Sequence, residues 1–98
     1  MAEIDLPEGW QLIAAESAKQ FELELHRELS PEHVLHNVPV RALARLQHRD
    51  DFLFQVPDDC YAQVHLTWHP ETSPMFPSTE LFHSLVEWRL FLEEDEIT

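Results

Sequence analysis

The stretch VRALARLQHRDDFLFQVPDDCYAQVHLTWH, residues 40–69, decides the fold. Its apolar side chains recur at every second position in three separate runs, and a period of two is that of a strand with one buried face. Asp50 and Asp51 separate the first two runs, and residues 57–59 separate the last two with the Pro and Asp that tight turns favour. We therefore expect a three-stranded antiparallel meander. One face should consist of Val40, Ala42, Ala44, Leu46, Phe52, Phe54, Val56, Ala62, Val64, Leu66 and Trp68.

An amphipathic helix is predicted on the N-terminal side of these strands. Apolar residues recur there at steps of three and four, which is the spacing of one helix face. They are Ala14, Ala18, Phe21, Leu25 and Leu29. Pro31 lacks a backbone donor and restricts the residue before it, so this helix should end near Leu29. Residues 1–13 are expected to form a lead-in segment with little regular structure.

A second helix is predicted after the proline-rich connection of residues 70–77. Ser78 or Thr79 would serve as its N-cap, with Glu80 in the first turn. Its apolar stripe would be Leu81, Leu85, Trp88 and Leu92. Residues 93–98 form an acidic tail that we expect to fray, because carboxylates are unfavourable near a helix C-terminus.

These elements predict a single α+β domain over residues 1–98, in the order helix, three-stranded antiparallel meander, helix. An antiparallel sheet must bury one face against another layer. We expect both helices to pack on the same face, with Trp68 and Trp88 buried in one core, and the other face to remain open.

The charge of the chain restricts its possible partners. Nineteen acidic residues against six Lys and Arg give a formal net charge of -13. Such a field repels nucleic acids and anionic membranes, and it attracts basic proteins. Cys60 is the only cysteine, which excludes an intramolecular disulfide and a cysteine zinc cluster. We find no signal peptide and no long apolar segment, so the sequence predicts a cytoplasmic protein.

Three short motifs resemble a family of small uncharacterised bacterial proteins. The motifs are residues 50–54, the VHLTW stretch at residues 64–68, and the FPST stretch at residues 76–79. The resemblance extends along most of the chain. It implies a stand-alone bacterial cytosolic domain and implies no known activity, ligand or cofactor.

Seven histidines are the main candidates for chemistry. His33 and His36 have a spacing that suits a helical turn. His65 and His69 lie on one face of a predicted strand, but positions four apart in a strand are separated by roughly 13 Å. That separation is too long for one shared metal ion, so we predict no metal site and no cofactor. A small metal-dependent or histidine-using enzyme is the alternative. Gly9 is the only glycine, which excludes glycine-rich phosphate loops.

The predicted open face of the sheet is the preferred contact surface. It would carry the partner-binding residues Arg41, Arg45, Tyr61, His65 and His69. Aromatic and Arg side chains are enriched at the centres of protein interfaces. In the last helix, Val86, Leu90 and Phe91 fall outside the stripe, so they should either pack under the N-terminal segment or form a second contact surface. The sequence therefore favours a non-enzymatic protein-interaction module. Two forms of this function are self-association as a homodimer and an inhibitor or immunity-like role in which the protein binds a basic partner.

Overall fold

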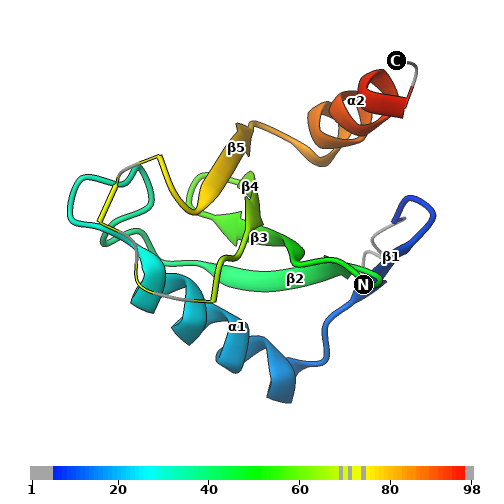
Figure 1. The fold of residues 1–98 in the computed structure, drawn as a ribbon. Coiled ribbons are helices and arrows are strands. Elements are labelled where there is room, and N and C mark those ends of the chain that lie inside the picture. The colour runs from blue at the N-terminus through cyan, green and yellow to red at the C-terminus, as the bar shows by residue number, and fades with distance from the viewer. Residues whose placement is uncertain (1–5, 69, 71, 74, 97–98) are drawn as a thin grey trace.

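The computed structural model describes residues 6–68, 70, 72–73 and 75–96. Seven elements follow one another along the chain (Figure 1). They are β1 (Trp10–Leu12), α1 (Ala15–Glu28), β2 (Arg41–Leu46), β3 (Asp51–Val56), β4 (Cys60–His65), β5 (Ser78–Phe82) and α2 (Leu85–Glu96). No helix within the described residues has the length and apolar character needed to cross a membrane.

Helix α1 agrees closely with the predicted helix of residues 14–29. Ala14 has extended backbone angles and precedes the first turn, and Leu29 is again extended, with a ψ of 128°. Pro31 accounts for this end, because the chain before a proline is driven out of the helical region. The face of α1 that meets the sheet carries Ala18 and Leu25, which are both buried.

The sheet has five antiparallel strands in the order β1-β2-β3-β4-β5, so the expectation of three strands is wrong. The three predicted strands correspond to β2, β3 and β4 and pair as consecutive hairpins. Two short strands extend the sheet on either side. β1 lies in the lead-in segment, where Trp10 pairs with Leu46 of β2. β5 lies in the region predicted to start a helix, and its Leu81 pairs with Ala62 of β4.

A β-bulge in β2 interrupts the expected alternation of side chains. Ala42 pairs with Phe54, whereas Ala44 pairs with Leu53, so the register shifts by one residue at Leu43. A one-residue shift transfers every following side chain to the other face of the sheet. Ala42 and Ala44 therefore lie on opposite faces, which corrects the prediction that they share one.

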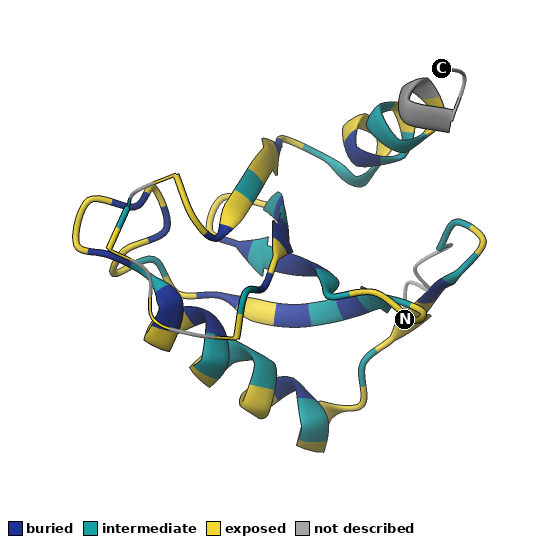
Figure 2. Cartoon of the chain, viewed as in Figure 1, coloured by how far each residue is buried: buried dark blue, intermediate teal, exposed yellow. Residues whose placement is uncertain are grey.

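The two helices cover opposite faces of the sheet, which corrects the prediction that both pack on one face. In Figure 1, α1 lies below the sheet and α2 lies above it. The α1-face cluster of buried residues consists of Ala18, Leu25, Leu35, Val40, Ala42, Phe52, Phe54, Val56, Ala62, Val64 and Leu66. The α2-face cluster consists of Trp10, Ala44, Leu53, Phe82 and Trp88. Figure 2 shows the result as buried central strands between two layers, and no face of the sheet is left fully open.

Trp68 and Trp88 do not share a core, contrary to our expectation. Trp88 is 1% exposed and packs edge-to-face on Trp10 in the α2-face cluster, with ring centroids 5.0 Å apart. Trp68 lies beyond the end of β4 with a φ of 65°, and it is 44% exposed. Its ring contacts Phe21 and Phe52 on the α1 face. β4 ends at His65, before Trp68. The alternation of side chains along a strand therefore no longer determines the face on which Trp68 lies.

The start of the last helix also differs from the prediction. Residues 78–82 are a strand, and the helix begins at Leu85 with Ser84 before it. The Ser84 hydroxyl accepts a hydrogen bond from the Glu87 amide at 3.1 Å, and the Glu87 carboxylate accepts one from the His83 amide at 3.2 Å. This is a variant of the capping box, in which a Ser and a Glu three residues later satisfy the first amides of a helix. The backbone of α2 continues to Glu96, and residues 97–98 of the acidic tail lie outside the described part.

Candidate protein-binding edge and apolar pocket

The four described residues among the five predicted to bind a partner do not all lie on one face of the sheet. Tyr61 is half-buried against the α2-face cluster, and His65 lies exposed on the same strand. The Arg45 guanidinium instead lies on the α1 face, over the rings of Phe21 and Phe52 at 5.7 and 5.2 Å. The bulge accounts for this change of face.

Arg41 is exposed at the start of β2, opposite Gln55, and His69 lies outside the described residues. Their role in binding stays a prediction.

His65 belongs to a row of polar residues that crosses three strands. Asp51, His65 and Ser78 are direct cross-strand neighbours, and the Asp51 carboxylate lies 3.0 Å from Nδ1 of His65. The residue types are those of a hydrolytic triad, which requires a hydrogen bond between serine and histidine. Among the described residues no such bond joins Ser78 to His65. The imidazole side chain is also 55% exposed. The row therefore gives the enzyme alternative no geometric support.

His33 and His36, whose spacing suits a helical turn, lie in different environments in the structure. His33 is buried, and its two ring nitrogens contact the Pro77 carbonyl at 2.9 Å and the Leu35 amide at 3.0 Å. His36 is exposed in the same loop. His33 thus ties the loop of residues 30–39 to the start of β5. Within the described part of the chain, no group of three or more His, Cys, Asp or Glu side chains is placed to hold a metal ion.

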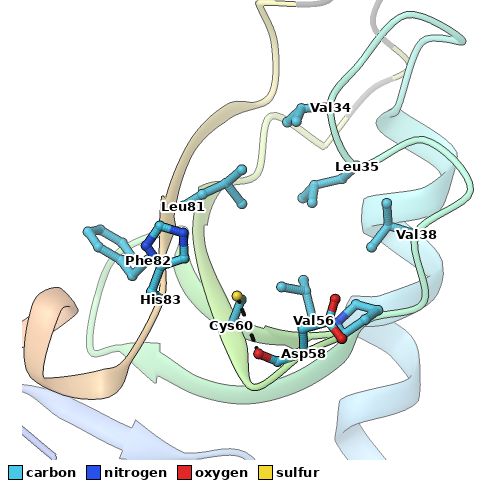
Figure 3. Close-up of a pocket in the computed structure, with 10 residues that line it drawn as sticks. Val34, Leu35, Val38, Val56, Asp58, Cys60, Leu81, Phe82 and His83 are labelled. Carbon is cyan, nitrogen blue, oxygen red and sulfur yellow. Dashed lines mark hydrogen bonds between the residues drawn. The ribbon is translucent and has the colours of Figure 1, made fainter.

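An apolar pocket of about 350 Å³ lies where this loop meets the end of β3 and the outer strand β5. Figure 3 shows Val34, Leu35 and Val38 of the loop on one side and Leu81 of β5 on the other, with Val56 and Cys60 between them. The same pocket is also lined by Pro57, Asp58, Phe82 and His83. Its volume is at the lower end of the range for ligand-binding cavities, and it would hold one or two large apolar side chains.

The turn between β3 and β4 shapes the lower wall of the pocket. Asp58 and Asp59 both have positive φ, at 65° and 59°. Asp tolerates this left-handed conformation because its short side chain can bond locally, and two such residues suit a tight hairpin. The turn brings Cys60 back to pair with Val56, and the Cys60 thiol donates a weak hydrogen bond to the Asp58 carbonyl at 3.5 Å (Figure 3).

Large apolar side chains at the mouth of the pocket are exposed to solvent. Val34 is 57% exposed and Leu81 is 50% exposed, although both lie beside the buried residues of the α1-face cluster. Leaving such side chains in water forgoes the free energy that their burial would provide. An apolar pocket with exposed apolar groups at its rim is typical of a contact surface.

The segments that build the pocket carry several acidic residues and no Lys or Arg. From residue 50 to residue 88 the chain contains no Lys or Arg, and residues 30–40 contain none either. The loop, the β3–β4 turn and β5 carry the acidic residues Glu32, Asp58, Asp59 and Glu80. Arg41, Arg45 and Arg49 lie on or just after β2, near the other edge of the sheet. Of the two strands, β2 thus carries Arg41 and Arg45, whereas β5 carries Glu80 and neither Lys nor Arg.

Our sequence reasoning missed this pocket because it assigned Leu81 to the buried stripe of a helix. The sequence does contain a pattern that marks the start of α2, because Ser84 and Glu87 have the spacing of a capping box. Placing the helix there would have left residues 78–82 as a separate element. The approach of the 30–39 loop to β5 depends on the His33 contact and has no counterpart in the local sequence pattern.

We compared the chain with models of protein families, with curated proteins and with solved structures, and none of them matched. The family resemblance carried by the VHLTW and FPST motifs therefore stays a prediction.

Proposed function

We propose that this protein is a non-enzymatic binding domain that associates with a basic protein through the β5 edge and the adjacent apolar pocket. The observation that carries the proposal is the exposed pair Val34 and Leu81 at the mouth of a pocket whose lining, among the described residues, contains Asp58 and neither Lys nor Arg. An apolar centre within a charged rim is the usual anatomy of a protein interface.

Charge complementarity favours a basic partner over a second copy of this chain. Each copy carries a formal charge of -13, so two copies repel one another at long range. A basic protein would be drawn toward the carboxylates beside the pocket, which raises the association rate and suppresses wrong partners. An inhibitor or immunity-like role against a basic enzyme is one form of this function.

The test begins with affinity purification from the native host, followed by measurement of binding between the purified partner and purified variants. Leu81→Ser removes the apolar group at the pocket. Leu23→Ser is a matched control, because Leu23 is 64% exposed on α1. Val86→Ser tests the outer surface of α2, where Val86 is 66% exposed.

We expect Leu81→Ser to raise the Kd at least about tenfold, as for a residue near the centre of an interface. The two other variants should leave the Kd within about twofold of wild type. The Kd should also rise with salt concentration, because screening weakens long-range attraction. Wild-type affinity in Leu81→Ser would overturn the proposal, and a selective loss in Val86→Ser would transfer the contact to α2.

A further inference from the structure

β5 is the outer strand of the sheet next to the proposed binding pocket. It pairs with β4 over residues 78–82, and the strand order ends with it. An outer strand directs one row of backbone amides and carbonyls toward its neighbour and the other row away from the sheet. Four of its five residues are exposed or half-exposed, and Figure 2 shows this strand mostly in yellow.

Side chains close this edge at both ends. At the beginning, Nε2 of His33 lies 2.9 Å from the Pro77 carbonyl and 3.3 Å from the Thr79 hydroxyl. At the end, the His83 amide donates to the Glu87 carboxylate. The stretch between these contacts is long enough for a short strand to pair with.

The opposite edge of the sheet has a different character. β1 has three residues, and its neighbour β2 carries Arg41 and Arg45. A basic segment would meet like charge there. On β5 it would meet the carboxylate of Glu80, and the strand itself carries no Lys or Arg.

The two faces of β5 would impose a pattern on any strand added to it. Leu81 pairs with Ala62, which is buried in the α1-face cluster, so Leu81 points to the pocket side. Glu80 pairs with Gln63 and points to the other side. Directly opposite residues of adjacent strands place their side chains within contact distance. An added strand would therefore present apolar side chains to Leu81 and basic side chains to Glu80.

A second copy of this chain fits the edge poorly. Glu80 is the central residue of β5, so two β5 strands paired antiparallel about that point would bring two Glu80 side chains together. Like charges directly opposite one another destabilise a strand pair. A partner with Lys or Arg at that position removes the repulsion.

We infer that the basic partner contributes an extended segment that pairs with β5 as a sixth strand, with a bulky apolar residue against Leu81 and a Lys or Arg next to it against Glu80. This inference rests on the proposed function and specifies how the partner is recognised. Main-chain hydrogen bonds would supply affinity, and the alternating side chains would supply specificity, as in other cases of strand addition.

The probe is a display library of random peptides of about ten residues, long enough to span an average strand. It is selected against the full chain and, as a control, against Leu81→Ser. We expect the wild-type selection to enrich peptides in which a bulky apolar residue is directly flanked by Lys or Arg. Selection against Leu81→Ser should lose that pattern. Absence of enriched peptides, or enrichment of acidic ones, would overturn the inference.

The backbone contribution is tested with two synthetic forms of one enriched peptide. Each is N-methylated at alternate residues, one on the even and one on the odd positions. Alternate amides of a strand point to opposite sides, so one form should lose binding at least about tenfold while the other stays close to the parent peptide. Equal effects of the two patterns would refute strand addition, as would a concentration-dependent dimer that blocks the peptide.

These outcomes separate the two proposals. If the methylation patterns have equal effects but the natural partner still requires Leu81, strand addition is wrong and the binding function stands. If the natural partner binds Leu81→Ser as well as wild type, the proposed function itself fails.

Discussion

The carboxylate of Glu28 accepts two hydrogen bonds from Thr67, one from its amide at 2.8 Å and one from its hydroxyl at 3.0 Å. The Trp68 amide donates a third bond to the same carboxylate at 2.8 Å. Glu28 is the last residue of α1 and is fully buried. One side chain thus fixes the end of the helix to the chain that leaves β4, where Trp68 has a positive φ.

Glu28→Ala should destabilise the fold by about 1–3 kcal/mol, because it leaves the part-buried backbone amides of Thr67 and Trp68 without their acceptor. Urea denaturation followed by circular dichroism measures the change in free energy of unfolding. Gln20→Ala on the exposed side of α1 is the matched control and should stay within about 0.5 kcal/mol of wild type. Equal stability of the two variants would contradict the role of Glu28.

The pH dependence of stability should reveal the same carboxyl group. Burial raises the pKa of Glu28, and the neighbouring Glu24 side chain raises this pKa further, while the bonds from Thr67 and Trp68 oppose the shift. A pKa that is higher in the folded state means that the folded protein binds the proton more tightly than the unfolded chain. This contribution to stability is complete below the unfolded pKa and is lost as the pH rises through the folded pKa.

Comparison with Glu28→Gln isolates that contribution, because Gln does not titrate. The free energy of unfolding of wild type relative to Glu28→Gln should increase as the pH falls from about 7 toward about 4.5. Urea denaturation at a series of pH values measures it. A difference that is constant over this range would show that Glu28 titrates normally.

Trp88→Ala should be far more destabilising than Trp68→Ala. Trp88 fills the α2-face cluster, and its indole nitrogen donates to the Gln63 amide oxygen at 2.8 Å. Removing a buried Trp costs about 3–5 kcal/mol, whereas the half-exposed Trp68 should cost about 1 kcal/mol. Thermal unfolding of the two variants gives the comparison. The reverse order would contradict the assignment of the two rings.

The combined replacement Arg45→Ala and Tyr61→Ala should destabilise the fold by about 2 kcal/mol. Arg45 covers two phenylalanine rings on the α1 face, and Tyr61 packs against the α2-face cluster. If both side chains lay on an open face of the sheet, as the sequence predicts, the double replacement would leave the stability unchanged. Differential scanning calorimetry of the variant distinguishes these two possibilities. Arg49→Ala, at an exposed position after β2, is the control and should stay close to wild type.

Periodicity predicted the parts of the fold in which local pattern and tertiary packing agree. The steps of three and four in residues 14–29 gave α1, and the alternation around Phe52 and Val64 gave the central hairpins. It failed at Leu43, because a bulge adds one residue to a strand without changing the apparent alternation of RALARL. The error reversed the predicted face of Arg45 and left the predicted contact surface scattered.

The outer strands were missed for a different reason. β1 has three residues, too few for a recognisable period. In β5, the polar start Ser78-Thr79-Glu80 resembles the beginning of a helix, but pairing with β4 outweighs that local preference. The candidate site lies at β5, so it depended on the part of the fold that local pattern could not supply.

The edge-to-face contact of Trp10 with Trp88 has a consequence for the order in which the protein is assembled. All buried members of the α1-face cluster precede residue 67, whereas the α2-face cluster needs one ring from before α1 and another from α2. A ribosome releases the chain from its N-terminus at a limited rate. We therefore expect the α1-face cluster to be able to form in the nascent chain before Trp88 is available to cover Trp10 and Leu53. Emergence of α2 would then be the step that buries the aromatic side chains of the α2-face cluster.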